Sequence, residues 1–408
     1  MERICEEQDV RPVSEYNGLH LRSAYQPVYS IAHRRQVGHE ALLRAFTVGG
    51  NPVPPPEVFA MAKNEAEITQ LDRLCRTLHV CNYVAAGPER GWLFLNVNPT
   101  VVVHGKNYGA FFSRLLEQYA LPPYRIVVEI LEGAIHDEAE LSEAVAYYRE
   151  LGCLVAIDDF GSGHSNFDRI WRLSPDIVKL DRSVIVQSTS NKKARRLLPG
   201  MVSLLHETGC LVLTEGVETE EEALNSMDAD VDFVQGYYFG RPVTSLDPQQ
   251  AGECHLTDLC GRFQREAEKE ATAWDTRTAP VMASLLRSAK ELEMGIPLGV
   301  ACSGLITEKR VERCYLLDAE GAQIGMNLVP SVLAAKADPR FAPLEDSSGA
   351  RWFRRPYFRR AIARFGRVRI SRPYLSLTGA HMCVTLSIGF HTRDGIRVLC
   401  CDLNAETL

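Results

Sequence analysis

The feature of this sequence that most constrains its fold is a pattern that recurs between residues 90 and 240. A short apolar run ends in a polar or charged residue, and a helix-forming stretch follows it. These polar residues are 20 to 36 residues apart, about the length of one strand and one helix. Such repetition predicts parallel strands joined by crossover helices, and its regular succession favours a closed barrel over an open sheet. The runs are residues 92–95, 126–128, 154–157, 177–178, 211–214 and 233–234.

The residues that end these runs are predicted to meet around one cleft, because the carboxyl ends of barrel strands converge on one face. Several of these residues are carboxylates, and two further acidic residues closely follow the later runs. All these carboxylates would repel one another in the cleft. Divalent cations would neutralise them, and all-oxygen ligands suit Mg²⁺ or Mn²⁺. The alternative is that each residue merely ends its strand at the surface. The set comprises Asn96, Glu129, Asp158, Asp159, Lys179, Asp181, Glu215, Glu218 and Gln235.

Composition limits the other classes of protein. The chain has 408 residues, 46% of them hydrophobic, which is enough for two ordinary domain cores. A net charge of -7 with scattered basic residues argues against a nucleic-acid polymer as partner. The longest apolar run, residues 295–306, is much shorter than the roughly 20 residues that cross a bilayer, so we expect no membrane span.

The cysteines favour a cytoplasmic protein with reduced thiols. Twelve of them are spread thinly along the chain, and its N-terminus lacks a signal pattern. Cys75, His79 and Cys81 are close together in a helical stretch, but they lack the spacing of a zinc site.

Two changes of character after Pro242 predict the domain organisation. Residues 246–294 are charged and helix-favouring, which indicates a helical linker. From about residue 295, short β-like segments and turns predict an antiparallel α+β domain. We therefore expect a barrel over residues 1–245, the linker over 246–294 and a second domain over 295–408.

Several short motifs follow one another between about residues 20 and 245. Together they resemble the EAL family of cyclic di-GMP phosphodiesterases, named after the triplet Glu40-Ala41-Leu42. That triplet alone is weak evidence, whereas the ordered set is specific. The resemblance implies a TIM-type (β/α) barrel that binds cyclic di-GMP. The other motifs are Tyr25-Gln26-Pro27, Asn96-Val97-Asn98-Pro99, Glu129-Ile130-Leu131-Glu132, Asp158-Asp159-Phe160-Gly161-Ser162-Gly163, Lys179-Leu180-Asp181, Glu215-Gly216-Val217-Glu218 and Gln235-Gly236-Tyr237.

The resemblance also implies a chemistry: hydrolysis of cyclic di-GMP to linear 5'-pGpG with two Mg²⁺ or Mn²⁺ ions per active site. Lys179 would orient the attacking water, Gln235 would hold that water or the phosphate, and Glu132 would support the mobile loop that begins at Asp159. The implied metal ligands are Glu40, Asn96, Glu129 and Asp158 for one ion, and Asp158, Asp159 and Glu215 for the other. The implied catalytic set is Lys179, Glu215, Gln235 and Glu40, and the implied substrate-binding set is Gln26, Leu42, Arg44, Asp181, Glu218 and Pro242.

One loop departs from the family's pattern. The family usually has Tyr-Ser-Ser after Gly163, whereas this chain has His164-Ser165-Asn166. In the family this loop couples metal binding to contacts within a homodimer, so the departure bears on regulation and turnover more than on the ligand. Two alternatives to an active hydrolase stay open: a catalytically silent receptor that signals through the C-terminal domain, and an unrelated barrel that acts on another phosphoester. The intact set of acidic residues and the lysine favours the enzyme.

The C-terminal part more loosely resembles the PAS/Cache-like sensor domains that follow some EAL barrels. The resemblance rests on residues 355–358, on residues 371–374 and on the closing strand that ends at Asp402. We expect Arg355, Tyr374 and Asp402 to line a pocket for a small polar ligand, since a guanidinium, a phenol and a carboxylate suit one. The alternative is that these residues only pack the fold.

Overall fold

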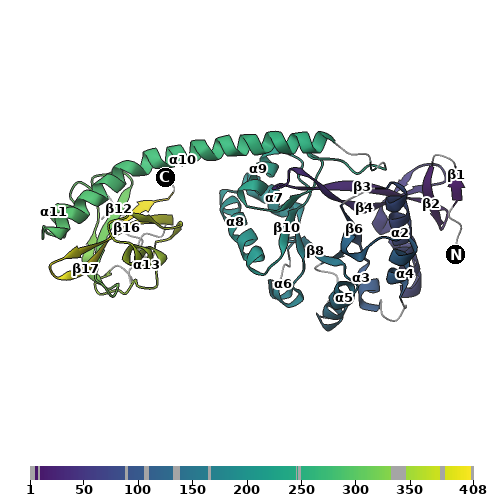
Figure 1. The fold of residues 1–408 in the computed structure, drawn as a ribbon, viewed down its shortest axis with the longest axis horizontal. Helices are drawn as coiled ribbons and strands as arrows, with labels where there is room; N and C mark the ends of the chain where they lie inside the picture. Colours follow the sequence, from purple (N-terminus) through teal and green to yellow (C-terminus); the bar gives the residue numbers. More distant parts are fainter. Residues whose placement is uncertain are drawn as a thin grey trace. The chain divides into compact units, whose positions relative to one another are not determined.

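A computed structural model describes residues 5–7, 10–87, 91–104, 110–131, 138–163, 167–244, 246, 250–331, 346–376 and 382–405 (Figure 1). The contacts between residues divide the chain into two units, Met1–Gln264 and Arg265–Leu408. The domain limits that we expect at residues 245 and 294 are not tested by this division and stay a prediction.

The first unit contains a closed eight-stranded barrel. The barrel strands are β3 (Leu19–Ser30), β4 (Arg35–Thr47), β6 (Trp92–Asn96), β7 (Ile126–Leu131), β8 (Leu154–Phe160), β9 (Ile177–Leu180), β10 (Leu211–Thr214) and β11 (Phe233–Val234). The ring closes because β3 pairs with both β4 and β11, and it is antiparallel to each. The predicted barrel is confirmed, with all six apolar runs in β6 to β11. The β3–β4 hairpin was not predicted, because it precedes the strand-helix repeat.

Helices cover the outside of the barrel, and several begin at side-chain caps just after a strand. Asp181 caps α7, and Thr219 with Glu222 forms a capping box at the start of α9. These helices are α1 (Pro55–Ala60), α2 (Glu65–Ala85), α3 (Pro99–His104), α4 (Phe111–Gln118), α5 (Glu138–Glu150), α6 (Phe167–Leu173), α7 (Arg182–Ser190), α8 (Lys192–Glu207) and α9 (Glu220–Asp228), with a 3-10 turn at Pro123–Arg125. Strands β1 (Cys5–Glu7), β2 (Val10–Tyr16) and β5 (Pro52–Val53) extend the sheet beyond the barrel.

The interior of the barrel has an apolar layer below a polar one. The apolar layer is a single buried cluster of Val28, Phe94, Val127, Ala156, Ile177, Leu213 and Phe233. Alternate residues of a strand share a face, so the side chain two positions farther on also points inward. At that position the sequence is polar: Asn96 follows Phe94, and Glu129 follows Val127. The apolar layer thus closes the barrel beneath a polar layer at the carboxyl ends of the strands.

Helix α10 (Gln250–Glu293) begins on the barrel. Its residues Leu256 and Leu259 are buried in the core between the barrel and its helices. Gly252 lies directly against the ring of Tyr29, where a Cβ would collide with the phenol. The first turns of this helix therefore belong structurally to the barrel unit.

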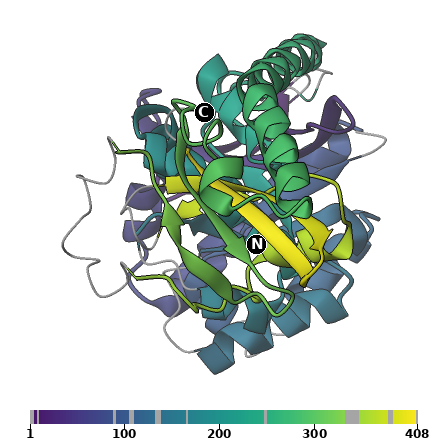
Figure 2. The ribbon, with the colours of Figure 1, turned by 90° about the vertical axis from the view of Figure 1, so that its left-hand side faces the viewer.

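The second unit is built around a six-stranded antiparallel sheet in the order β13-β12-β17-β16-β14, with β15 also paired to β16. Its elements are β12 (Val311–Leu317), β13 (Gln323–Leu328), β14 (Arg369–Ile370), β15 (Tyr374–Leu375), β16 (Met382–Thr392), β17 (Gly395–Asn404), α11 (Leu298–Ala301) and α13 (Pro356–Ala363). The later part of α10, with α11, packs on one face of this sheet (Figure 2). Helix α13 packs on the other. The predicted antiparallel α+β class is confirmed, while the PAS/Cache-like assignment stays a prediction.

The structure offers no candidate for a membrane-crossing helix within its described residues, since none is both long and apolar enough.

Two buried histidines in the barrel unit are expected to make the fold sensitive to acid. His79 bonds Ser23 through Nδ1 at 2.8 Å, and burial lowers the pKa values of His39 and His79 from 6.5 to about 4. Because each folded-state pKa lies below the unfolded one, stability is lost as the pH falls from about 6.5 toward 4. The expected loss between pH 7.5 and 5 is about 2 kcal/mol for each histidine.

Urea unfolding at these two pH values measures this loss. The variant His79→Gln should reduce the loss between the two pH values by about 2 kcal/mol, whereas His255→Gln, which changes an exposed histidine, should leave the loss unchanged. An equal pH dependence in all three proteins would contradict the assignment.

Candidate active site

The polar layer of the barrel brings together side chains from most of its strands. Glu40 comes from β4, Asn96 from β6, Glu129 from β7, Asp158 from β8 and Lys179 from β9. Glu215 and Gln235 follow the last residues of β10 and β11. Most of the predicted metal-binding and catalytic residues therefore share one inward-facing layer, where the alternation of the strands places them.

Lys179 lies at the centre of this layer and is only 1% exposed. Its Nζ is 2.5 Å from Glu129 Oε1, 3.0 Å from Asp158 Oδ1 and 3.9 Å from Glu40 Oε1, and it also pairs with Glu215. Burial by itself lowers the pKa of a lysine, but the surrounding carboxylates, Asp158 and Glu129 foremost, outweigh it and raise the pKa well above 10.5. The carboxylates therefore favour the charged form of Lys179.

One ammonium does not neutralise the carboxylates around it. Burial, and next the charge of Glu40, raises the pKa of Glu129 well above its usual range although Lys179 acts against this. Burial likewise raises the pKa of Glu215 well above 4.5. Both carboxylate oxygens of Glu129 are buried, and Oε2 makes no hydrogen bond to any residue that the structure describes. The site thus has an excess of acidic oxygens that a further cation would stabilise.

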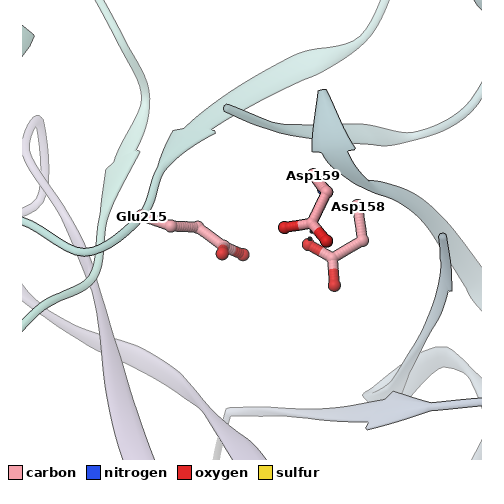
Figure 3. A group of neighbouring side chains, drawn as sticks. All are labelled: Asp158, Asp159 and Glu215. Carbon is pink, nitrogen blue, oxygen red and sulfur yellow. Dashed lines mark hydrogen bonds between the residues drawn. The ribbon is translucent and has the colours of Figure 1, made fainter. Parts of the chain in front are cut away.

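Asp158, Asp159 and Glu215 form a group of carboxylates suited to a metal ion (Figure 3). One oxygen from each lies within 4.8 Å of the others. Neighbouring residues of a regular strand face opposite sides, but the register shifts between Ile157 and Phe160, and Asp159 has φ +59°. This left-handed residue turns the end of β8 so that both aspartates reach the same site, an arrangement that costs backbone strain. Hard oxygen donors of this kind fit Mg²⁺, Mn²⁺ or Ca²⁺.

Glu40 is held in place by two amides. Asn96 Nδ2 donates to its Oε1 at 2.9 Å, and Gln235 Nε2 donates to its Oε2 at 2.7 Å. These bonds join three of the predicted site residues across the barrel. The amide oxygen of Gln235 is buried and makes no hydrogen bond to a described residue, so it is available to a ligand.

The residues expected to bind substrate lie in several places. Gln26 is opposite Glu40 on β3 and donates to the carbonyl of Gly240 at 3.2 Å. Leu42 and Arg44 follow Glu40 at alternate positions of β4, so they share its face. Pro242 lies just after the barrel and is half-buried.

Asp181 and Glu218 are engaged in other contacts. Asp181 caps α7 by accepting the Ser183 N–H at 3.0 Å, and Glu218 pairs with Arg182 at 2.5 Å. Glu132, His164 and Asn166 lie outside the described residues.

Sequence reasoning missed a buried support for this site in α2. Asp72 pairs with Arg76 at 2.5 Å, both being 3% exposed, and it accepts the backbone N–H of Asn98 at 3.0 Å. This bond fixes the segment that follows Asn96. An acid and an arginine four residues apart, in a helix that also buries Leu71 and Leu78, are the signal that could have revealed it.

Comparison with known proteins identifies the family to which the chain belongs. The EAL domain family matches residues 15–242, more than half of the chain. The chain is 30% identical to the probable cyclic di-GMP phosphodiesterase PdeN of Escherichia coli over 54% of its own length and 43% of that protein. It is 31% identical to the cyclic di-GMP phosphodiesterase RocR of Pseudomonas aeruginosa over 41% of each chain.

A solved structure resembles nearly the whole chain. The YkuI protein of Bacillus subtilis, with an EAL domain and in complex with its substrate c-di-GMP and calcium, has a TM-score of 0.78. It is 22% identical, and the alignment covers 94% of this chain and 96% of that one, so both units share its fold. The chain spans less than half the length of the curated relatives it matches first. With its barrel, acidic centre and matching family model, the chain belongs to the EAL domain family.

Proposed function

We propose that the barrel hydrolyses cyclic di-GMP to linear 5'-pGpG with two Mg²⁺ or Mn²⁺ ions in its active site. The observation that carries this proposal is the crowd of buried carboxylates around Lys179, in a family whose relatives include named cyclic di-GMP phosphodiesterases. A dianionic substrate approaches such a site only when cations offset its negative charge.

The predicted metal ligands form two sets, one for each ion, and the two sets have one residue in common. Asp158 would contribute to both ions, with Glu40, Asn96 and Glu129 holding one and Asp159 and Glu215 the other. Two divalent ions supply a bound water of lowered pKa and stabilise negative charge on the phosphate in the transition state. The unpartnered oxygen of Glu129 and the converging carboxylates of Asp158, Asp159 and Glu215 support this division.

Lys179 acts in this proposal as a hydrogen-bond donor and a fixed positive charge. The carboxylates around it raise its pKa and so favour the charged form, which donates hydrogen bonds. It orients the attacking water and stabilises the developing negative charge. Gln235 is held on Glu40 by its amide nitrogen, which leaves its oxygen to accept a hydrogen bond from that water.

Residues around the rim of the barrel bind the substrate. Gln26, Leu42, Arg44 and Pro242 contact the nucleotide, and Arg44 supplies a guanidinium for its phosphates. Asp181 and Glu218, whose carboxylates bond Ser183 and Arg182 in the structure, exchange those contacts for the ligand.

We also expect the chain to act as a cytoplasmic homodimer. Leu197 and Leu204 lie two turns apart on α8 and are 71% and 43% exposed, so this helix offers an apolar contact to a second copy.

The first prediction from this proposal concerns metal. Purified full-length protein incubated with cyclic di-GMP should release linear pGpG when Mg²⁺ or Mn²⁺ is present, and this hydrolysis should stop when EDTA removes the ion. Chromatography resolves the product from the substrate. Mn²⁺ without substrate should also raise the melting temperature, because it relieves repulsion among the carboxylates. Turnover that is independent of metal would contradict the mechanism. Ligand binding without turnover in either metal would identify a silent receptor instead.

The second prediction separates binding from chemistry. The variant Lys179→Met should lower kcat by about a hundredfold or more, because it removes a charge that stabilises the transition state, while the Kd for cyclic di-GMP changes little. Lys193→Met, which changes an exposed lysine of α8, is the matched control and should retain full activity. A parallel loss of binding and turnover in a folded Lys179 variant would make this lysine a ligand anchor.

A further inference from the structure

Helix α13 covers one face of the second sheet, and at one end of this face the side chains form an ordinary apolar core. Paired residues of β12, β17 and β16 form rows across this face, one of which is Leu317, Val398 and Gly389. Here α13 packs so closely that a Cβ on Gly389 would lie 2.6 Å from the carbonyl oxygen of Ala361. The helix and the sheet leave no space at this end.

Two rows farther along the same face, the side chains are charged and polar. This row is Arg313, Asp402 and Thr385. Arg313 Nε lies 3.1 Å from Asp402 Oδ2, and Thr385 Oγ1 donates to Asp402 Oδ1 at 2.7 Å. Their exposed fractions are 9%, 4% and 0%. The face therefore passes from an apolar core to a buried ion pair within a few residues.

A gain in stability is a weak explanation of this ion pair. Desolvation of two charges offsets most of their attraction, and replacing a buried pair by packed apolar residues is often neutral or stabilising by about 1–4 kcal/mol. The row of Leu317, Val398 and Gly389 shows that this face accommodates such packing. A role in recognition is the better account of Arg313 and Asp402.

A cavity of about 30 Å³ lies beside the polar row, and Arg355, Tyr374 and Asp402, the three residues expected from the sequence, all line it. Its aromatic wall includes Tyr357 stacked on Tyr374, with ring centroids 6.1 Å apart and planes at 20°. On its polar wall, Trp352 Nε1 donates to Gln323 Oε1 at 3.1 Å. A polar cavity of this size holds water or a small polar molecule.

Arg355 gives the cavity a positive charge. Its guanidinium lies 5.3 Å from the ring centre of Tyr374, and it forms no ion pair with any carboxylate of the described residues. The other arginine of the lining, Arg313, is already neutralised by Asp402. The described lining thus carries two guanidinium groups and one carboxylate, which favours an anion.

We propose that this cavity binds a small carboxylate, with the Arg355 guanidinium as its ion-pair partner. The ring of Tyr374 holds the planar guanidinium in place, and a planar fork of donors matches a carboxylate. The limited volume selects short carboxylates that carry hydroxyl, keto or amino groups, which the polar wall of Gln323 and Asn327 recognises.

Calorimetric titration of the full-length protein tests this proposal with stated probes: acetate, lactate, pyruvate, glycine and succinate. Acetamide is the neutral isostere of acetate, and inorganic phosphate represents a different anion. At least one carboxylate should bind with a Kd below about 10 mM and at least about tenfold more tightly than acetamide or phosphate. Failure of every carboxylate to bind, equal binding of acetamide, or preferred binding of phosphate would overturn the proposal.

Variants of neighbouring arginines locate the site. Arg355→Gln should weaken binding of the best carboxylate by about tenfold or more, and Arg355→Lys should weaken it less because the charge remains. Arg359→Gln changes an exposed arginine of α13, the helix that Arg355 precedes, and lies outside the cavity lining; it is the matched control and should bind normally. Equal effects of the variants at 355 and 359 would show that the cavity is not the site. If Arg355→Gln does not fold, comparison of Arg355→Lys with Arg359→Lys decides in the same way.

Discussion

The repulsion among buried carboxylates around Lys179 is the interaction on which the barrel's site depends. Glu129, Asp158, Glu215 and Glu40 all lie within ion-pair distance of a single ammonium. Such a group is stable only inside a frame that does not relax, and it keeps its affinity for additional cations. The closed barrel supplies that frame, because pairing of β3 with both β4 and β11 leaves no free edge in the ring.

The layered interior explains how ordinary strands produce this site. Each parallel strand contributes an apolar side chain below and a polar one above, as Val127 and Glu129 do on β7. The apolar layer excludes water from beneath, which strengthens electrostatic interactions above it. The second unit has a similar arrangement on an open sheet, where an apolar row of side chains is followed on the same face by Arg313 and Asp402.

Sequence alone predicted the barrel and most of the residues at its polar end, because strand period and parallel topology place the terminating residues on one face. It did not predict the β3–β4 hairpin, whose long strands carry no crossover helix. It also did not show how Asp158 and Asp159 act together, since that depends on a register shift and on the positive φ of Asp159. The contact of Asp72 with Asn98 is tertiary, and its local sign is no more than the spacing of Asp72 and Arg76. The sequence analysis also did not predict that Asp181 would bond Ser183 or that Glu218 would pair with Arg182.

We propose that the acidic centre holds two divalent ions that share Asp158. Calorimetric titration of the full-length protein with Mn²⁺, in the absence of nucleotide, measures this directly. We expect two ions per chain, and we expect Asp158→Asn to weaken both while Asp168→Asn, whose carboxylate pairs with Arg172 on α6, changes neither. Absence of Mn²⁺ binding, or two ions bound with unchanged affinity in the Asp158 variant, would contradict it.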